Sequence, residues 1–223
     1  MMERTAAVEN RPASGTNQPA IELRGLRRDF GERTALGGIS ARLEQGENLA
    51  VLGPNGSGKS TLLRILAGLL RPSGGDVTVL GCALPKETHR LRGRVGYLGH
   101  APLLYRDLSP RENLALAAAL HGLEPAGSEA RIGDLLDRVG MSARADDRVA
   151  ELSAGMKQRV DICRAVLHEP GLLLLDEPDA HLDVEARVLV EPLIGPGSGK
   201  SRVVVSHDRD SATVGADLVL ELP

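Results

Sequence analysis

Aromatic residues are nearly absent from this chain, which has one phenylalanine, two tyrosines and no tryptophan among 223 residues. Proteins that bind single-stranded nucleic acid stack bases on aromatic side chains, and such a platform is missing here. Charge of one sign does not dominate either, because 27 basic residues face 30 acidic residues for a net charge of −3. That balance offers no electrostatic attraction for a polyanion. Nucleic acid is therefore not expected as a partner.

Cysteine is scarce, and long apolar runs are missing. Cys82 and Cys163 show no metal-ligand spacing, as expected of small core residues in a reducing cytosol. No stretch approaches the roughly 20 apolar residues needed to span a bilayer, so we expect any membrane-spanning part to be another chain. Residues 1–19 lack the basic-then-apolar order of a signal peptide. We expect them to form a disordered leader, and we do not expect secretion.

Short apolar runs predict the strands of one α/β domain over residues 20–223. The apolar content of 42% is sufficient for a buried core, and runs rich in Val, Ile and Leu indicate strands buried on both faces. The helical stretch within 109–168 brings no evident strand, which predicts a helical insertion over about 99–169 into a core of about 20–98 and 170–223. The expected strands are 21–26, 48–52, 76–80, 171–175, 202–205 and 217–222.

Two amphipathic helices carry start or stop signals. Over 110–122, Ser109 can cap the first turn and Glu112 completes a capping box. Over 128–140, the apolar residues share one face and Gly140 suits a left-handed cap. Both segments are therefore predicted to be helical.

A glycine-rich loop is the strongest local signal. Residues 53–61 read GPNGSGKST, between the strand-like NLAVL and the helix-like LLRILAGLL. They satisfy the pattern G-x-x-x-x-G-K-[ST], in which backbone N–H groups and the following helix N-terminus face phosphate oxygens. Lys59 is expected to bridge the β- and γ-phosphates, Ser60 to bind Mg²⁺ and Thr61 to bond the α-phosphate. The residues expected to hold the triphosphate are Gly53, Pro54, Asn55, Gly56, Ser57, Gly58, Lys59, Ser60 and Thr61.

A near-copy of this loop lacks the required context. Residues 197–201 read GSGKS, but position 194 is Ile instead of Gly and the segment precedes a strand-like run. We interpret it as a surface turn.

An apolar run ends in two carboxylates. Residues 172–178, LLLLDEP, place Asp176 and Glu177 at the carboxyl end of a predicted strand, where open α/β folds bind ligands. Asp176 suits the Mg²⁺ shell, and Glu177 suits the polarisation of an attacking water. Such a pair alone is more often a solvated strand end. Beside a phosphate-binding loop, the catalytic interpretation is favoured.

The order of these segments resembles the nucleotide-binding domains of ABC ATPases. The phosphate loop is followed by LSAGM at 152–156, LLLLDEP at 172–178 and VVVSHD at 203–208. The resemblance covers about residues 21–223. It implies an α/β fold with a P-loop ATPase core, made of a mixed or parallel sheet with flanking helices and antiparallel strands, and an inserted helical subdomain.

That resemblance also implies an activity, cofactors and partners. ATP and Mg²⁺ would be bound between two copies arranged head to tail, and ATP hydrolysis would power a separate membrane-spanning transporter subunit from the cytoplasmic face of the membrane. Ser153 and Gly155 would contact the γ-phosphate held by the opposite copy. His207 resembles the switch histidine that touches the γ-phosphate, and Asp183 the acidic residue of the loop across the dimer interface. The residues that the resemblance marks as catalytic are Lys59, Glu177 and His207.

Phe30 stands where the family often has an aromatic residue that stacks on adenine. A plain core phenylalanine is the alternative interpretation.

Two departures from the family pattern bear on which ABC ATPases this chain resembles most. Ala154 and Met156 alter the usual LSGGQ, and methionine cannot hydrogen-bond as glutamine does. His100 stands where a glutamine that contacts Mg²⁺ and water usually opens the loop facing the membrane subunit, and neutral histidine accepts a hydrogen bond through one ring nitrogen only. The loop YLGHAPLLYRDLSPRENL and the alanine of LSAG are similar to haem-exporter ATP-binding subunits of cytochrome c maturation.

Three other functions stay open beside haem export. They are the ATPase subunit of a generic exporter of drugs, lipids or ions, a soluble ABC ATPase of translation or DNA repair, and an ATP-binding regulator that does not hydrolyse. The soluble class usually carries paired nucleotide domains or long coiled coils, which this chain lacks.

The remaining histidines form no ligand spacing with one another or with the cysteines. We expect these four residues to face solvent. They are His89, His121, His168 and His181.

Overall fold

The computed structural model describes residues 18–207, 209 and 213–223. Except for its last two residues, the expected leader over 1–19 lies outside this part of the chain. Among the described residues, each helix is too short or too polar to cross a membrane.

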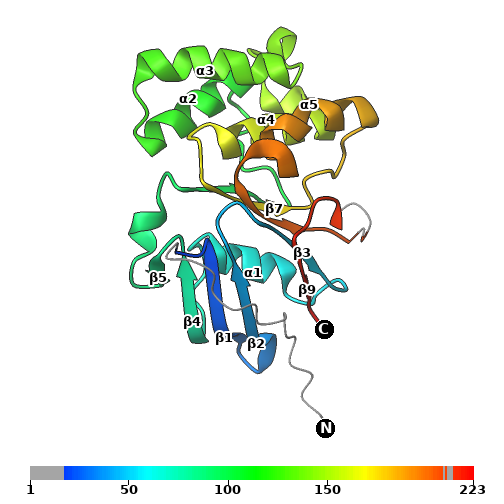
Figure 1. Ribbon diagram of the computed structural model, residues 1–223. Helices are drawn as coiled ribbons and strands as arrows, with labels where there is room; N and C mark the ends of the chain where they lie inside the picture. The colour runs from blue at the N-terminus through cyan, green and yellow to red at the C-terminus, as the bar shows by residue number, and fades with distance from the viewer. Residues whose placement is uncertain (1–17, 208, 210–212) are drawn as a thin grey trace.

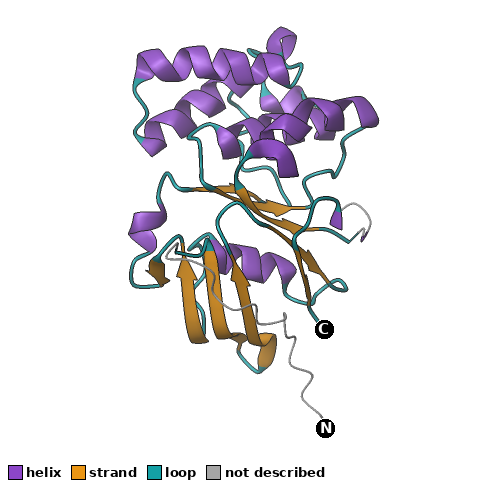
Figure 2. Ribbon diagram, in the orientation of Figure 1, coloured by secondary structure: helices purple, strands orange, loops and turns teal. Residues whose placement is uncertain are grey.

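Two sheets and five α-helices make up the described fold (Figures 1 and 2). One sheet is antiparallel with the strand order β2-β1-β4-β5, and the other is parallel with the order β6-β7-β8-β3-β9. The strands are β1 (Ile21–Phe30), β2 (Arg33–Leu43), β3 (Asn48–Leu52), β4 (Gly74–Val79), β5 (Cys82–Leu84), β6 (Val95–Leu98), β7 (Leu172–Asp176), β8 (Ser201–Val205) and β9 (Leu218–Glu221). The helices are α1 (Lys59–Leu66), α2 (Pro110–His121), α3 (Pro125–Arg138), α4 (Ala154–Val166) and α5 (Val184–Ile194), with short 3-10 turns at Thr88–Leu91, Ser142–Arg144, Val149–Glu151 and Pro196–Ser198.

The parallel sheet separates two apolar cores. On one face, Leu172 and Leu174 of β7 pack with α1 and the antiparallel sheet. On the other face, Leu173 and Leu175 pack with the helices α2 to α5. Figure 1 shows the helices above the parallel sheet, with α1 and the antiparallel sheet below it. Because successive side chains of a strand point to opposite faces, this run is apolar at every position, as the sequence predicted.

Local capping signals agree with the structure where the helices begin. The Ser109 Oγ accepts a hydrogen bond from the Glu112 backbone N–H at 3.2 Å, and the Glu112 carboxylate accepts one from the Ser109 N–H at 2.8 Å. The capping box of α2 is therefore confirmed. By contrast, α3 begins at Pro125, about one turn before the expected Ser128. Proline suits this position because the N–H groups of a helix's first turn have no partner within the helix, so the missing N–H of proline costs no hydrogen bond.

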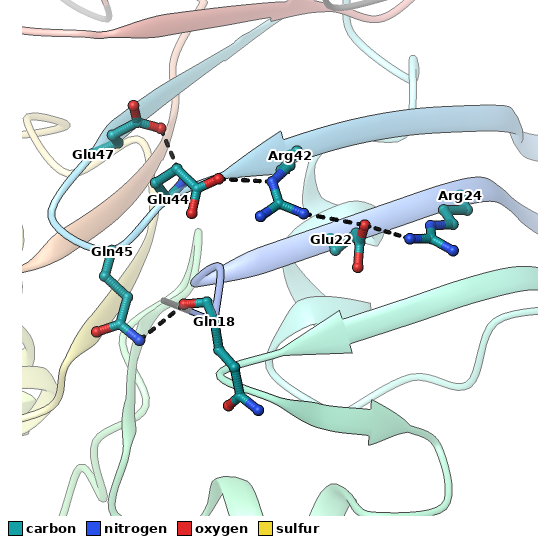
Figure 3. A network of polar contacts seen from close by, with 7 residues as sticks. All are labelled: Gln18, Glu22, Arg24, Arg42, Glu44, Gln45 and Glu47. Carbon is teal, nitrogen blue, oxygen red and sulfur yellow. Dashed lines mark hydrogen bonds and ion pairs between the residues drawn. The ribbon is translucent and has the colours of Figure 1, made fainter. Parts of the chain in front are cut away.

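Polar contacts on the antiparallel sheet tie the start of the described chain to the turn after β2 (Figure 3). Arg42 contacts Glu22 and Glu44 at 3.4 and 2.7 Å, and the Gln45 amide donates to the Gln18 carbonyl at 3.0 Å. Ion pairs at this degree of exposure contribute little stability each.

Both cysteines are free thiols with no exposed surface. Burial raises the pKa of the Cys163 thiol to about 12. They are core residues, as expected.

The expectation that the four remaining histidines face solvent is wrong for two of them. His121, at the end of α2, and His168, after α4, are half-buried and stack with ring centroids 3.8 Å apart. His168 also contacts the Val95 carbonyl oxygen at 3.0 Å. Burial, and then the neighbouring His121 ring, lowers the pKa of His168 to about 4, and burial lowers the pKa of His121 as well.

Acid is expected to weaken the fold through this pair. The folded-state pKa of His168 lies below the unfolded value of 6.5, so the unfolded chain takes up the proton first as the pH falls. The stability that the neutral ring contributes is complete above about pH 6.5 and is lost toward pH 4. Between pH 7 and pH 5, the unfolding free energy of His168→Gln should fall by about 1 kcal/mol less than that of the parent, after allowance for solvent screening.

Urea unfolding at the two pH values measures this change. The exposed His89 serves as the matched control, because His89→Gln should leave the pH dependence of the parent. A His168→Gln protein with the parent's pH dependence would show that the stack does not carry it.

Candidate nucleotide site

The glycine-rich loop joins the end of β3 to the start of α1. Gly58 caps α1 with a left-handed φ of 98°, a backbone conformation that residues with a side chain rarely adopt. A Cβ at this position would also collide with the Ala35 carbonyl oxygen and with Leu36 of β2. The loop can therefore turn into the helix only with glycine at residue 58, and α1 presents its N-terminus to the same space.

Lys59 folds back over the loop. Its Nζ donates to the Gly53 carbonyl at 2.6 Å and to the Pro54 carbonyl at 2.9 Å, and the residue is only 8% exposed. The ammonium group is thus held among the loop atoms, where it can reach an anion that enters the loop.

Asp176 ends β7 beside this loop. Its carboxylate accepts a hydrogen bond from the Ser60 hydroxyl, and burial raises its pKa, with Ser60 and His100 acting in the opposite direction. Its Oδ2 is buried and has no hydrogen-bond partner in the described part of the chain. An orphaned carboxylate oxygen next to a hydroxyl is a pair of hard donors that suits Mg²⁺. Among the described residues, no cluster of three or more His, Cys, Asp or Glu could hold a metal ion by itself.

Replacing Asp176 by asparagine should separate stability from metal binding. Because the folded-state pKa of Asp176 is raised, its ionised form destabilises the fold at neutral pH, and this penalty disappears below about pH 4. We expect Asp176→Asn to raise the unfolding free energy at pH 7 by about 1 kcal/mol and to abolish the stabilisation that Mg²⁺ adds in the presence of ATP.

Thermal unfolding with and without Mg²⁺ tests both effects. Asp134→Asn, at an exposed site on α3, is the control and should change neither. A loss of stability in metal-free Asp176→Asn would contradict the interpretation of Asp176 as a strained, ligand-free carboxylate.

Glu177 follows in a backbone conformation that is uncommon for its type. Its φ is 52°, and its N–H donates to the Val205 carbonyl at 2.8 Å, which fixes the turn after β7. The His207 Nδ1 lies 3.0 Å from its Oε2. Buried Gln158 of α4 donates to the Pro178 carbonyl at 3.1 Å. Strained backbone held by its surroundings is a feature of functional sites, and here it aims a carboxylate at the loop.

These groups surround a cavity of about 560 Å³. Ten of the residues predicted to bind or act on the nucleotide line it, and they come from four separate parts of the chain. The lining residues are Phe30, Arg33, Ala35, Asn55, Gly56, Gly58, Lys59, Ser60, Thr61, His100, Asp176 and Glu177. Gly53, Pro54 and Ser57 complete the same loop, and His207 contacts the cavity wall through Glu177.

Phe30 is 47% exposed, so the alternative interpretation as a plain core residue is wrong. The guanidinium carbon of Arg28 lies 4.4 Å from its ring centroid. A cation over the ring holds it in place through its π electrons. The ring is thereby presented at the rim of the cavity, where a planar base could stack.

Arg33 is a lining residue that the sequence did not indicate. Its Nη2 donates to the Gly56 carbonyl at 3.2 Å. The pairing of Phe30 with Arg33 across the β1–β2 hairpin brings it to the loop, and no motif marks that register in advance. The role of Arg33 can therefore be recognised only after the register of the hairpin is known.

Three further predicted residues, on α4 and before α5, do not line the cavity either. Ser153 caps α4 by accepting from the Met156 N–H at 3.2 Å, and Asp183 caps α5 by accepting from the Ala186 N–H at 2.8 Å. Gly155 packs against the His181 backbone so closely that a Cβ would lie 2.6 Å from its carbonyl oxygen. The structure therefore joins the start of α4 to the loop before α5 and keeps both away from the cavity of the same chain.

The near-copy of the loop at 197–201 is a turn. Residues Pro196–Ser198 form a 3-10 turn, Gly199 is left-handed, and β8 begins at Ser201. The segment precedes a strand, as interpreted from sequence, and it does not line the cavity.

Comparisons with known proteins converge on one family. The family model described as ABC transporter matches residues 36–180. Nod factor export ATP-binding protein I of Paraburkholderia xenovorans (strain LB400) is 34% identical over 87% of this chain and 65% of its own length. Aliphatic sulfonates import ATP-binding protein SsuB 2 of Burkholderia cenocepacia (strain HI2424) is 38% identical over 98% of this chain and 79% of its own length.

A solved structure shares the fold. It is described as a dimeric post-hydrolysis state of an ATP-binding cassette bound to ADP and phosphate, and it is 26% identical with a TM-score of 0.80 over 91% of this chain and 96% of that chain. The fold predicted from the sequence is therefore confirmed. The present chain spans less than two thirds of the Nod factor relative's length.

Proposed function

Because the chain belongs to the ABC transporter family of ATP-binding proteins, we propose that it binds ATP with Mg²⁺, hydrolyses it and powers a separate membrane-spanning subunit. One observation carries the proposal. A single cavity gathers the phosphate loop, the orphaned carboxylate of Asp176 and the carboxylate of Glu177. A phosphate cradle, a metal ligand and a base are what phosphoryl transfer to water requires.

The side chains divide this work by position. Backbone N–H groups of 53–61 and the N-terminus of α1 bind the phosphates, and Lys59 neutralises charge between the β- and γ-phosphates. Ser60 and Asp176 would hold Mg²⁺, which supplies positive charge to the phosphate oxygens. Glu177 orients the attacking water and accepts its proton, and His207 contacts the Glu177 carboxylate through Nδ1 at 3.0 Å.

Two copies are needed to complete each site in this proposal. Ser153 and Gly155 lie at the N-terminus of α4 but do not line the cavity of their own chain. A helix N-terminus favours an anion, so this end of α4 suits the γ-phosphate held by another copy. Asp183 begins the helix next to this region and would lie at the interface. The ATP-binding cassette with a similar fold is described as dimeric, which supports the pairing of two copies.

The altered residues Met156 and His100 suggest an ATP-binding regulator that does not hydrolyse, but the residues that are intact argue against it. Met156 and His100 weaken two contacts that glutamine makes elsewhere in the family. Lys59, Asp176 and Glu177 are nevertheless all present and converge on one cavity. Phosphate release by the purified chain with its membrane partner separates the two functions, since a regulator would release none above background.

The helical region over about 99–169 is where we place the membrane subunit. The segment after His100 exposes Leu103 at 51% and Tyr105 at 64%. Exposed apolar side chains on a loop that also reaches the nucleotide cavity suit a surface that senses nucleotide and grips a partner. The chain would then lie peripherally on the cytoplasmic face of the membrane.

For the cargo, we propose haem in the context of cytochrome c biogenesis. The support is the sequence of the His100 loop and the alanine of LSAG, which are similar to haem-exporter subunits. The relatives described above are named for Nod factor export and aliphatic sulfonate import. A generic exporter of drugs, lipids or ions is therefore the alternative, favoured by the export relative.

The test is to purify the chain from detergent-solubilised membranes and identify the spanning subunit that accompanies it. The complex, returned to liposomes, should hydrolyse ATP faster when haem is added than when a lipid-linked or drug-like amphiphile is added. Recovery of the chain in a soluble complex only would overturn the transporter proposal. Stimulation by the amphiphile alone would overturn haem as cargo and leave ATP-driven transport standing.

A further inference from the structure

A buried ion pair on α4 is used by none of the roles above. Asp161 has no exposed surface, and its Oδ1 accepts from the Arg164 Nε at 2.6 Å. The same Oδ1 accepts from the Leu103 backbone N–H at 3.2 Å. Arg164 in turn donates through Nη2 to the Tyr97 carbonyl at 2.7 Å. The pair thus binds backbone groups of another segment as well as each other.

Burying this ion pair costs desolvation free energy, so the pair is a poor source of stability. The Asp161 Oδ2 is buried without a hydrogen-bond partner in the described part of the chain, and burial raises the pKa of the carboxyl group. Well-packed apolar residues often stabilise a core as well as or better than a buried ion pair. A buried pair whose partners are specific backbone atoms instead fixes one conformation of the segment that it holds.

The segment that it holds carries His100. Tyr97 lies three residues before His100 and Leu103 three residues after it, and His100 itself lines the nucleotide cavity. The pair therefore anchors the chain on both sides of the histidine. Farther along the loop, the buried Asn113 side chain of α2 accepts from the Tyr105 N–H at 2.7 Å and donates to the Tyr105 carbonyl at 3.0 Å.

We propose that Asp161 and Arg164 are positioning residues that hold His100 at the nucleotide and link it rigidly to α4. The proposal rests on the ATP hydrolysis proposed above. Since Ser153 caps α4 and Gly155 lies in its first turn, one ion pair would join the helix that faces the opposite copy's ATP to the loop that faces the chain's own ATP. Movement of α4 on dimer closure would then displace His100 and the exposed loop together.

The test measures ATP hydrolysis by the full chain at saturating Mg²⁺, at a temperature well below unfolding. Asp161→Ala should lower kcat about tenfold and change KM for ATP less than twofold, because His100 is misplaced while the phosphate loop is intact. Arg164→Lys, which keeps the charge, should restore more of kcat than Arg164→Ala. Amide hydrogen exchange over 99–105 should become faster in Asp161→Ala.

Val160→Ala is the matched control, because this buried residue precedes Asp161 on the same helix. It should lower Tm but leave kcat and the exchange over 99–105 at the parent values. Adding Asp161→Ala to His100→Ala should slow hydrolysis no further than His100→Ala alone.

An Asp161→Ala protein with the parent kcat, or one whose kcat falls by the same factor without His100, would overturn the proposal. A His100→Ala protein as fast as the parent would do so too. A parent chain that hydrolyses no ATP with its partner would instead overturn the proposed function, so the two failures are distinguishable.

Discussion

Replacing Glu177 by glutamine should stop ATP hydrolysis while leaving ATP binding intact. The amide has the size of the carboxylate but cannot accept the proton of an attacking water. Loss of a positioned general base lowers rates by about 10²- to 10⁴-fold. The phosphate loop and Asp176 are untouched, so affinity for Mg·ATP should stay within about twofold. ATP that is bound but not hydrolysed should then hold two copies together, since the proposed interface includes the γ-phosphate.

Two measurements check this expectation. Phosphate release reports the rate, and gel filtration in Mg·ATP reports the dimer. Glu185→Gln, at an exposed site in the first turn of α5, is the matched control and should behave as the parent. A Glu177→Gln chain that hydrolyses at the parent rate would show that another group is the base.

Replacing Lys59 by methionine should instead remove binding. The ammonium group is the only side-chain charge that lies within the loop itself, and charge-assisted hydrogen bonds to phosphate are worth about 1.5–3 kcal/mol each. We expect affinity for ATP to fall about 100-fold, which corresponds to about 2.7 kcal/mol. The Gly53 and Pro54 carbonyls would also lose their shared donor, so the nucleotide-free protein should become less stable.

A fluorescent ATP analogue measures the affinity, and thermal unfolding measures the stability. The chain contains its own control in Lys200, the lysine of the GSGKS turn, whose Nζ lies 3.5 Å from the Ser198 carbonyl. Lys200→Met should bind ATP as the parent does. Equal losses in the two variants would mean that the lysine at 59 is not specific for the nucleotide.

Sequence reasoning was strongest where a residue's role depends on its immediate neighbours. The run 172–175 had to be a strand buried on both faces because it has no polar side to expose, and Ser109 with Glu112 had to start a helix because each satisfies the other's backbone. The glycine at 58 follows from the same logic in its left-handed φ, which is a property of the turn itself. Such constraints act between residues that are close in the chain, and they can therefore be recognised in the sequence.

The remainder depended on contacts between distant segments. β2, β5 and β6 were not predicted: β6 has only four residues, and β2 contains two glycines and pairs with β1 through irregular register. Arg33 reaches the loop only through that hairpin. His121 and His168, whose rings stack, are 47 residues apart in sequence, and no spacing rule for metal ligands could reveal their contact.

The burial of both cysteines, described with the fold, makes the chain a ready background for site-specific labelling. Cys82 and Cys163 have no exposed surface, and the Cys163 thiol, with its pKa of about 12, supplies almost no reactive thiolate at neutral pH. A maleimide dye or spin label should therefore react almost only with a cysteine placed at an exposed position such as Tyr105. The movement of the loop beyond His100 could then be followed through a nucleotide cycle without first removing the native thiols.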